Sequence, residues 1–440
     1  MDAQHGRNPV SNAASGLYSR EAPLHVLVTA DALSGAWTYT RELVTGLVTR
    51  GVRVTLVSFG EILLPEQTTW MDHLHGLDYR PTAFRLEWMQ EAEQDLPESS
   101  AFLTALVEEM QPDLLHLNQF CYGNLPVDVP RVVMAHGDMI TRSHAVKGRL
   151  DGDRLDNDRL DNDRLNQDHP GLDRASNDRS SNDRSSNDRT GNHRASQSHF
   201  PLKWYRDTIL RGIAAADAVV APSAWMLDRI RACYAPPQRA EVIYPGRNPI
   251  FFNPYVSKDD CVLAVGRLVD ASRQVFLLTQ HTHAVPVCIV GAEQTVPGNR
   301  VPIRADVKLA TDQTSVAIRG PQTEAQLRAL YSRASIYAAT ARYEPLGMPA
   351  LEAAFSRCAI IANDIPSFRE IWGDAALYFR TNDAASLADS IRLLNSDRTM
   401  CRAYAELAYS RARERFTTKR MIDEYLQLYR NLLSVHAAAA

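Results

Sequence analysis

The chain has 440 residues, of which 45% are hydrophobic, and a formal net charge of −4. This length exceeds what one hydrophobic core usually supports and predicts two domains, while the small net charge gives no nucleic-acid-binding signature. The six cysteines form no Cys-x-x-Cys pair, which argues against structural zinc and disulfides and predicts a reducing, cytoplasmic location. Residues 1–22 lack the apolar core of a signal peptide, and no apolar run is long enough to cross a bilayer, so any membrane contact is expected to be peripheral.

After this polar leader, which is predicted to be disordered, apolar strands alternate with amphipathic helices. We predict strands at 24–29, 52–57, 114–117, 132–135 and 218–221, with helices at 38–50, 204–215 and 224–233. Ser223 has the side chain expected of an N-cap for the last of these helices. The alternation predicts a doubly wound parallel sheet. The chain contains no Gly-x-Gly-x-x-Gly, which disfavours a nicotinamide dehydrogenase.

Residues 149–194 interrupt the alternation with an arginine at every fifth position, except that His169 occupies one register. A five-residue step advances about 140° around an α-helix and therefore builds no fixed face. The segment also has too little apolar surface to offset its ordering entropy, so we predict a disordered pentapeptide-repeat insertion over 149–198. Its Asp-x-Asp sequences, such as Asp151-Gly152-Asp153, look like metal-binding motifs, but no strand surrounds them to fix their geometry. No metal site is predicted.

The Pro- and Gly-rich segment 244–249 is the predicted linker between domains. A second series follows it, with strands at 261–265, 287–290, 316–318, 336–339, 359–362 and 376–379. Helices are predicted at 325–333 and 366–372, then from residues 384 and 398, with a last helix around 421–433. The second half therefore repeats the strand–helix pattern of the first.

The junction between strand 336–339 and the following helix carries the most informative residues. Glu344 lies in the loop and Glu352 on the helix, and Gly347 and Met348 lie between them, where N–H groups at a helix N-terminus are free. Free amides and the helix dipole favour an anion such as a diphosphate. Two carboxylates can accept hydrogen bonds from sugar and ribose hydroxyls. This combination is what a sugar-nucleotide site needs.

Two further residues directly follow predicted buried strands. Arg267 follows strand 261–265 after a glycine, and His136 follows strand 132–135. Ligands of parallel sheets gather beyond the carboxyl ends of the strands, and a guanidinium there can bind a phosphate through two hydrogen bonds. A lone arginine or histidine after a strand is also compatible with a surface or structural role.

The Glu344-x7-Glu352 spacing, after Gly266-Arg267, resembles the motif of retaining GT-B-fold glycosyltransferases of family 4, the glycogen synthase-like group. The resemblance implies two Rossmann-like domains facing a cleft, with the acceptor-side domain over 23–245 and the nucleotide-sugar domain over 246–410. A C-terminal helix within 411–440 is then expected to cross back to the first domain.

The family also implies roles for individual residues. Glu344 would contact the donor sugar and His136 would face it, while Arg267 and Arg273 would stabilise the leaving diphosphate. Family members usually supply a lysine near the latter position, and Ser272 occupies its commoner spacing. Donor contacts are expected from Glu352, Gly347, Met348, Leu351, Gly35 and Ser34. Weaker candidates for the acceptor pocket are Asn118, Tyr122 and Asp138.

The implied reaction moves a sugar from a nucleoside-diphosphate sugar to an acceptor hydroxyl with retention, without a metal or another cofactor. Three residues depart from the usual family pattern, namely Ala36, Pro245 and Leu346. Ala36 replaces a second glycine and would tolerate a positive φ poorly. Two alternatives stay open: a catalytically degenerate scaffold that uses the repeat as an interaction arm, and a non-hydrolysing sugar-nucleotide epimerase. The sequence identifies neither the donor sugar nucleotide nor the acceptor.

Overall fold

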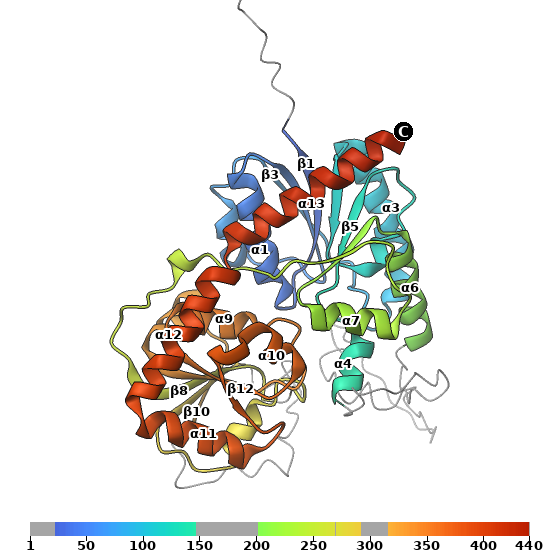
Figure 1. Cartoon of the computed structure of the whole chain (residues 1–440). Helices are drawn as coiled ribbons and strands as arrows, with labels where there is room; N and C mark the ends of the chain where they lie inside the picture. Colours follow the sequence, from blue (N-terminus) through green and yellow to red (C-terminus); the bar gives the residue numbers. More distant parts are fainter. Residues whose placement is uncertain (1–22, 147–200, 269, 292–315, 440) are drawn as a thin grey trace, which may run out of the picture.

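A computed structural model of the chain describes residues 23–146, 201–268, 270–291 and 316–439. These residues form two α/β domains, one above the other in Figure 1. The predicted leader over 1–22 and repeat insertion over 149–198 lie outside the described residues. The two-domain, parallel-sheet fold class predicted from the sequence is confirmed.

The first domain contains a seven-stranded parallel sheet in the order β3-β2-β1-β4-β5-β6-β7. Its central strands are buried on both faces, which is why they read as continuous apolar runs in the sequence. The strands are β1 (His25–Asp31), β2 (Arg53–Phe59), β3 (Leu77–Pro81), β4 (Leu114–Leu117), β5 (Arg131–Met134), β6 (Ala218–Ala221) and β7 (Ala240–Val242). The helices are α1 (Ala36–Thr49), α2 (Pro65–Thr68), α3 (Ala92–Met110), α4 (Met139–Val146), α6 (Leu202–Ala215) and α7 (Ala224–Cys233). As predicted, the Ser223 side chain caps α7 by accepting a hydrogen bond from the Met226 N–H.

The second domain contains a six-stranded parallel sheet in the order β10-β9-β8-β11-β12-β13. The strands are β8 (Asp259–Val265), β9 (Val287–Val290), β10 (Val316–Arg319), β11 (Ala334–Ala339), β12 (Ala359–Asn363) and β13 (Leu377–Phe379). The helices are α8 (Glu324–Arg333), α9 (Met348–Phe355), α10 (Pro366–Trp372), α11 (Ala384–Ser396) and α12 (Arg398–Arg415). The strand order places β8 and β11 side by side at the centre of the sheet, so the loops after them lie together.

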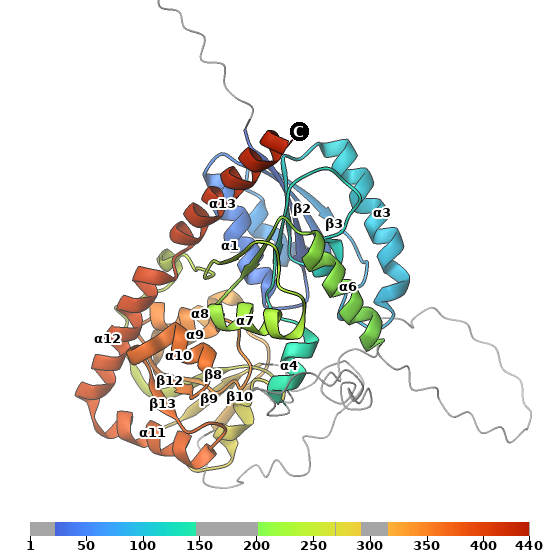
Figure 2. The same cartoon turned by 45° about the vertical axis from the view of Figure 1, so that its right-hand side comes forward.

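The last helix, α13 (Thr418–Ala439), packs on the first domain, whereas α12 packs on the second. Figure 2 shows the two helices in line along one side of the molecule. A Cβ added at Gly46 of α1 would lie 2.4 Å from the Ile422 side chain, so the glycine permits this close helix contact. The Tyr429 hydroxyl on α13 lies 2.7 Å from Nδ1 of His116 on β4. The helix is thereby fastened to the first sheet.

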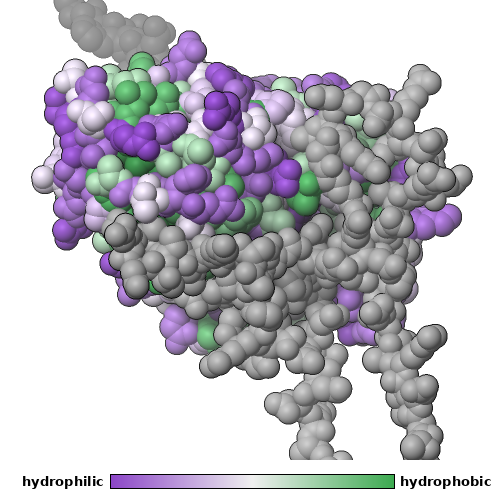
Figure 3. All heavy atoms as spheres, turned by 90° about the horizontal axis from the view of Figure 1, so that it is seen from below, coloured by the Kyte–Doolittle hydropathy of each residue, from purple (hydrophilic) through white to green (hydrophobic). Residues whose placement is uncertain are grey.

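The surface at the second-domain end of the molecule is mainly hydrophilic in its described part, with apolar residues in small groups (Figure 3). Among the described helices, none combines the length and apolar character needed to cross a membrane.

Candidate functional site

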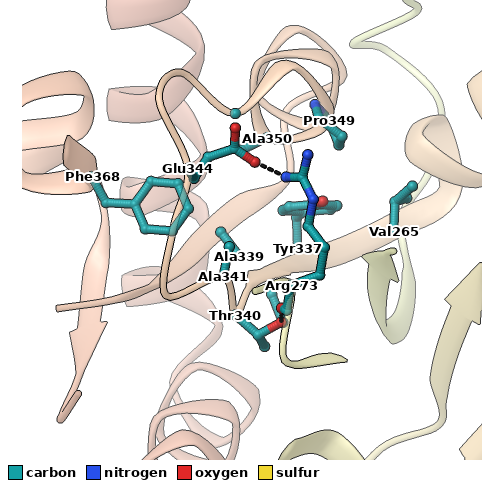
Figure 4. Close-up of a pocket in the computed structure, with 12 residues that line it drawn as sticks. Val265, Arg273, Tyr337, Ala339, Thr340, Ala341, Glu344, Pro349, Ala350 and Phe368 are labelled. Carbon is teal, nitrogen blue, oxygen red and sulfur yellow. Dashed lines mark hydrogen bonds and ion pairs between the residues drawn. The ribbon is translucent and has the colours of Figure 1, made fainter. Parts of the chain in front are cut away.

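The loops after β8 and β11 form a pocket at the carboxyl edge of the second sheet. Figure 4 shows the side chains of Arg273 and Glu344 pointing toward each other inside it, with Val265 on one side and Phe368 on the other. The rest of the lining comes from residues 337–341 and from Gly347, Pro349 and Ala350. The structure therefore brings together two of the four predicted catalytic residues.

Arg273 and Glu344 form an ion pair through Nη1 and Oε2. The Glu344 side chain is 9% exposed and that of Arg273 is 36% exposed, so the pair lies at a pocket wall with one side open to solvent. The Thr340 hydroxyl donates to the Arg273 carbonyl at 2.7 Å, which ties the β8 loop to the end of β11. A cation and an anion are thus held at the point where a charged ligand would enter.

Gly347 begins α9 beside this pair in a left-handed conformation, with φ of +89°. A Cβ there would make ordinary contacts at 3.4 Å with Glu344 Cγ and Phe368 Cε1, so it is the positive φ that favours glycine at this position. Met348 is the first helical residue, and Gly347, Pro349 and Ala350 at the start of the helix line the pocket. Leu351 is fully buried in the core, which gives its side chain a packing role, and its predicted donor contact stays a prediction.

Two further cations lie near Arg273. Arg267 is exposed directly after β8, as predicted. Arg142, which the sequence analysis did not identify, reaches from α4 of the first domain to Asp270, with 2.8 Å between Nη2 and Oδ1. Burial alone would raise the pKa of Asp270, but Arg142 and the Ser272 hydroxyl outweigh it and hold the pKa below its usual value. Ser272 is buried and bonded to Asp270 at 2.6 Å, which leaves Arg273 as the residue facing the pocket.

Glu352 lies on α9 but faces the domain linker. Its Oε1 is 2.9 Å from Nε of Arg247, and the residue is 8% exposed. Burial raises the pKa of Glu352, and Arg247 opposes that rise. The two glutamates of the motif therefore have different environments: Glu344 lines the pocket, and Glu352 belongs to a charged cluster beside it.

In the first domain, His136 and Asn118 are in direct contact, with 2.7 Å between Nε2 and Oδ1. The Asn118 amide nitrogen donates to the Thr29 carbonyl, so Oδ1 is an acceptor and Nε2 of His136 carries the proton. Burial lowers the pKa of His136 to about 3, so the ring is neutral near pH 7. In this tautomer Nδ1 carries the lone pair, and the ring offers a hydrogen-bond acceptor at that atom.

The loop after β1 places Ser34 and Gly35 at the surface. Gly35 has φ of −60°, and Ala36 is already the first residue of α1. The second position of this loop therefore requires no positive φ, and the alanine that departs from the family pattern fits without strain.

Two predicted acceptor residues are structural. Tyr122 is 2% exposed and packs on Phe59 in the core, with 5.0 Å between ring centroids. Asp138 is buried and accepts hydrogen bonds from the Ile140 and Thr141 N–H groups at the start of α4. These contacts give both residues a structural role, and their part in an acceptor pocket stays a prediction.

Besides the contact between Arg142 and Asp270, several contacts join the two domains around the site. The Tyr343 hydroxyl lies 2.8 Å from Thr141 Oγ1. The Ser223 hydroxyl donates to the Pro345 carbonyl at 2.7 Å. The Glu370 carboxylate on α10 accepts from the first two N–H groups of α7, at 2.7 and 2.8 Å. Tyr343 and Pro345 flank Glu344 in the sequence, so proximity to the motif could have identified them, whereas Glu370 carried no local signal.

Within the described ranges, no group of three or more His, Cys, Asp or Glu side chains is placed to hold a metal ion. The six cysteines, which all fall within these ranges, are free thiols.

Two doubly wound domains with strand ends facing each other across a ligand site define the GT-B class of proteins. Residues 250–411 match the family model described as glycosyl transferases group 1, and residues 33–174 match that of glycosyltransferase family 4. The chain belongs to this group 1, family 4 glycosyltransferase family.

Similar curated proteins include an α-maltose-1-phosphate synthase of Mycolicibacterium smegmatis, 27% identical over 50% of this chain and 64% of that protein. They also include the lipopolysaccharide core biosynthesis mannosyltransferase LpcC of Rhizobium leguminosarum, 26% identical over 48% of this chain and 68% of that protein. The chain thus spans less than two thirds of the maltose-1-phosphate synthases that it matches.

Solved structures share the fold at low sequence identity. Sucrose-phosphate synthase from Thermosynechococcus elongatus superposes with a TM-score of 0.65 at 16% identity, covering 94% of this chain and 100% of that one. The Anabaena protein HepE in complex with UDP-glucose gives a TM-score of 0.64 at 13% identity, covering 93% of this chain and 100% of that one.

Proposed function

We propose that the protein transfers a sugar from a nucleoside-diphosphate sugar to an acceptor hydroxyl, with retention at the anomeric carbon. The observation that carries the proposal is the Arg273–Glu344 pair beside the N-terminus of α9. Arg273 and the helix amides suit a diphosphate, and Glu344 suits a sugar hydroxyl. Family membership supports the same assignment.

The costly step in such a reaction is cleavage of the bond between the sugar and the diphosphate. Negative charge grows on the leaving oxygen, and preorganised cations stabilise it most effectively when they are already in position. The Arg273 backbone is held by Thr340 and its guanidinium by Glu344. Burial lowers the pKa of Arg273, and Arg142 and Arg267 lie close enough to lower it further. With positive charge supplied by arginines, the reaction needs no metal. The departing oxygen then takes the proton of the acceptor hydroxyl.

The acceptor would enter from the first domain, where Asn118 and His136 meet. Because His136 is neutral and its Nε2–H is engaged by Asn118, its role is to accept a hydrogen bond through Nδ1. It thereby orients a sugar hydroxyl and does not act as a general acid at neutral pH.

Release of free nucleoside diphosphate tests this function directly. The protein is incubated with UDP-, GDP- and ADP-glucose in turn, with and without EDTA, and UDP-glucose comes first because the HepE structure contains it. We expect release from one donor that is unaffected by EDTA, lost in Glu344→Gln, and increased by the correct acceptor. NMR of the product then reports anomeric configuration. Conversion of the donor without diphosphate release would favour an epimerase, and absence of both turnover and nucleotide binding would favour a scaffold.

A further inference from the structure

A buried arginine of the domain linker, Arg247, lies among acidic side chains from both domains. It is 1% exposed, and its guanidinium contacts Glu42 of α1, Glu324 of α8 and Glu352 of α9. The contact with Glu324 joins Nη2 to Oε1 at 3.0 Å, and the contact with Glu352 joins Nε to Oε1 at 2.9 Å. One cation therefore bridges the first domain to the helix that begins at the donor pocket.

The backbone holds Arg247 in this position. Its N–H donates to the Phe416 carbonyl at 3.0 Å, and its carbonyl accepts from the Thr418 N–H at 3.2 Å. These partners belong to the turn between α12 and α13, where the chain crosses back to the first domain. Thr418 also donates from its hydroxyl to Glu42. The domain linker and the turn between α12 and α13, which both pass from one domain to the other, thus meet at Arg247. The guanidinium is therefore fixed relative to both α1 and α9.

The hinge cluster, defined as Arg41, Glu42, Arg247, Glu324, Arg328 and Glu352, contains three cations and three anions. Arg41 and Arg328 both contact Glu324, whose side chain is 35% exposed, whereas those of Glu42 and Glu352 are 6% and 10% exposed. Two nearly buried carboxylates therefore depend mainly on Arg247. Glu352 is also faced by Tyr331 of α8 and Tyr337 of β11, and more remotely by Glu324 and Arg41.

We propose that Arg247 is a positioning residue for the donor, which holds Glu352 ionised and in one orientation for the ribose hydroxyls and ties it to α1 of the first domain. The inference rests on the proposed function, because it takes Glu352 as a ligand of the nucleotide. A buried carboxylate without a cation favours its neutral form, and a neutral carboxyl loses acceptor strength toward a hydroxyl. Removing the guanidinium should therefore weaken nucleotide binding, most at low pH, without touching the pocket itself.

The single substitution Arg247→Met would leave two buried carboxylates without a cation, so folding itself is at risk. The paired variant Glu42→Gln/Arg247→Met removes one charge of each sign and keeps the cluster balanced. Glu42→Gln alone is the matched control, since it retains the contact between Arg247 and Glu352. Thermal unfolding checks that both variants are folded.

The experiment measures the Kd of UDP, with GDP and ADP in parallel, by calorimetry from pH 6.5 to 8.5. We expect Glu42→Gln to stay within about threefold of the wild type, and the paired variant to bind at least about tenfold more weakly at pH 6.5. Relative to the wild type, the paired variant should recover affinity as pH rises and Glu352 ionises. Adding Glu352→Gln to it should abolish that recovery.

Equal Kd values and equal pH profiles for the control and the paired variant would overturn this inference and leave the proposed function intact. A folded wild-type protein that binds none of the three nucleotides would overturn the proposed function and, with it, the role of Arg247.

Discussion

The guanidinium of Arg273 contacts the carboxylate of Glu344 within the pocket formed by the loops after β8 and β11. The two residues lie far apart in the sequence but at the ends of adjacent parallel strands. The charge-assisted contact orients both side chains within the pocket. In the proposed reaction the arginine exchanges part of this contact for the diphosphate, while the glutamate remains available to the sugar.

Glu344→Gln should therefore lower kcat by about 10²-fold or more, because the neutral amide keeps the shape but loses the negative charge beside the reacting sugar. Stability should change little, since the partner Arg273 is 36% exposed and can be solvated. Steady-state kinetics and thermal unfolding measure the two effects. Glu406→Gln, at a side chain 56% exposed, is the control for the same chemical change. A Glu344→Gln protein that is misfolded, or one that is fully active, would contradict this role.

Gly347→Ala should lower the free energy of unfolding by about 1–2 kcal/mol, because an alanine there must adopt φ of +89°. The added methyl would make ordinary van der Waals contact with Glu344 at 3.4 Å, so the loss should come from the backbone conformation. Gly35→Ala is the matched control: φ is −60° and no heavy atom lies within 4 Å of the added Cβ, so its effect should stay within about 0.5 kcal/mol. Urea unfolding of both variants measures the difference, and equal losses would refute the conformational argument.

Glu370→Ala should loosen the contact between the domains. The carboxylate caps the start of α7 from across the boundary and also accepts from the Tyr244 hydroxyl at 2.9 Å. Loss of a cap costs about 1 kcal/mol, and here that energy belongs to the domain contact. We expect a larger radius of gyration in small-angle X-ray scattering and a donor KM raised several-fold. Glu406→Ala serves as the surface control. An unchanged radius of gyration and an unchanged KM would exclude a role of Glu370 in holding the domains together.

Most of the fold could be predicted because buried parallel strands can be recognised in the sequence as continuous apolar runs. The elements that the sequence analysis did not predict include β3 and α3. The edge strand β3 (Leu77–Pro81) is short and only half-buried, and Asp78, Arg80 and Pro81 leave it without the continuous apolar run that marks the central strands. Helix α3 contains Pro97, which obscures a helical pattern. Both elements are specified by their packing on the sheet more than by local sequence.

The candidate site was predictable where a loop follows a strand, as for Arg267, Arg273 and Glu344. It was not predictable where a contact joins the domains. The pairing of Arg142 with Asp270 spans 128 residues, and nothing near either residue indicates the other. Likewise, Glu352 has the expected position in the motif, but its partner Arg247 comes from the linker. Such contacts depend on how two domains dock, which local patterns do not encode.

His116 should make stability fall with decreasing pH. Burial lowers its pKa from 6.5 to about 3 in the folded protein, so between these values the unfolded chain binds a proton that the folded chain does not. The stabilisation is complete above pH 6.5 and is lost as pH falls toward 3, with a slope of at most about 1.4 kcal/mol per pH unit.

His116→Gln should flatten this slope in urea unfolding between pH 4 and 7, although loss of the contact with Tyr429 lowers stability at pH 7. His136, whose pKa burial also lowers to about 3, should contribute to the slope that remains. His73→Gln, at an exposed position, controls for the substitution itself. An identical pH slope in His116→Gln and the wild type would show that the ring is not held neutral by burial between β4 and α13.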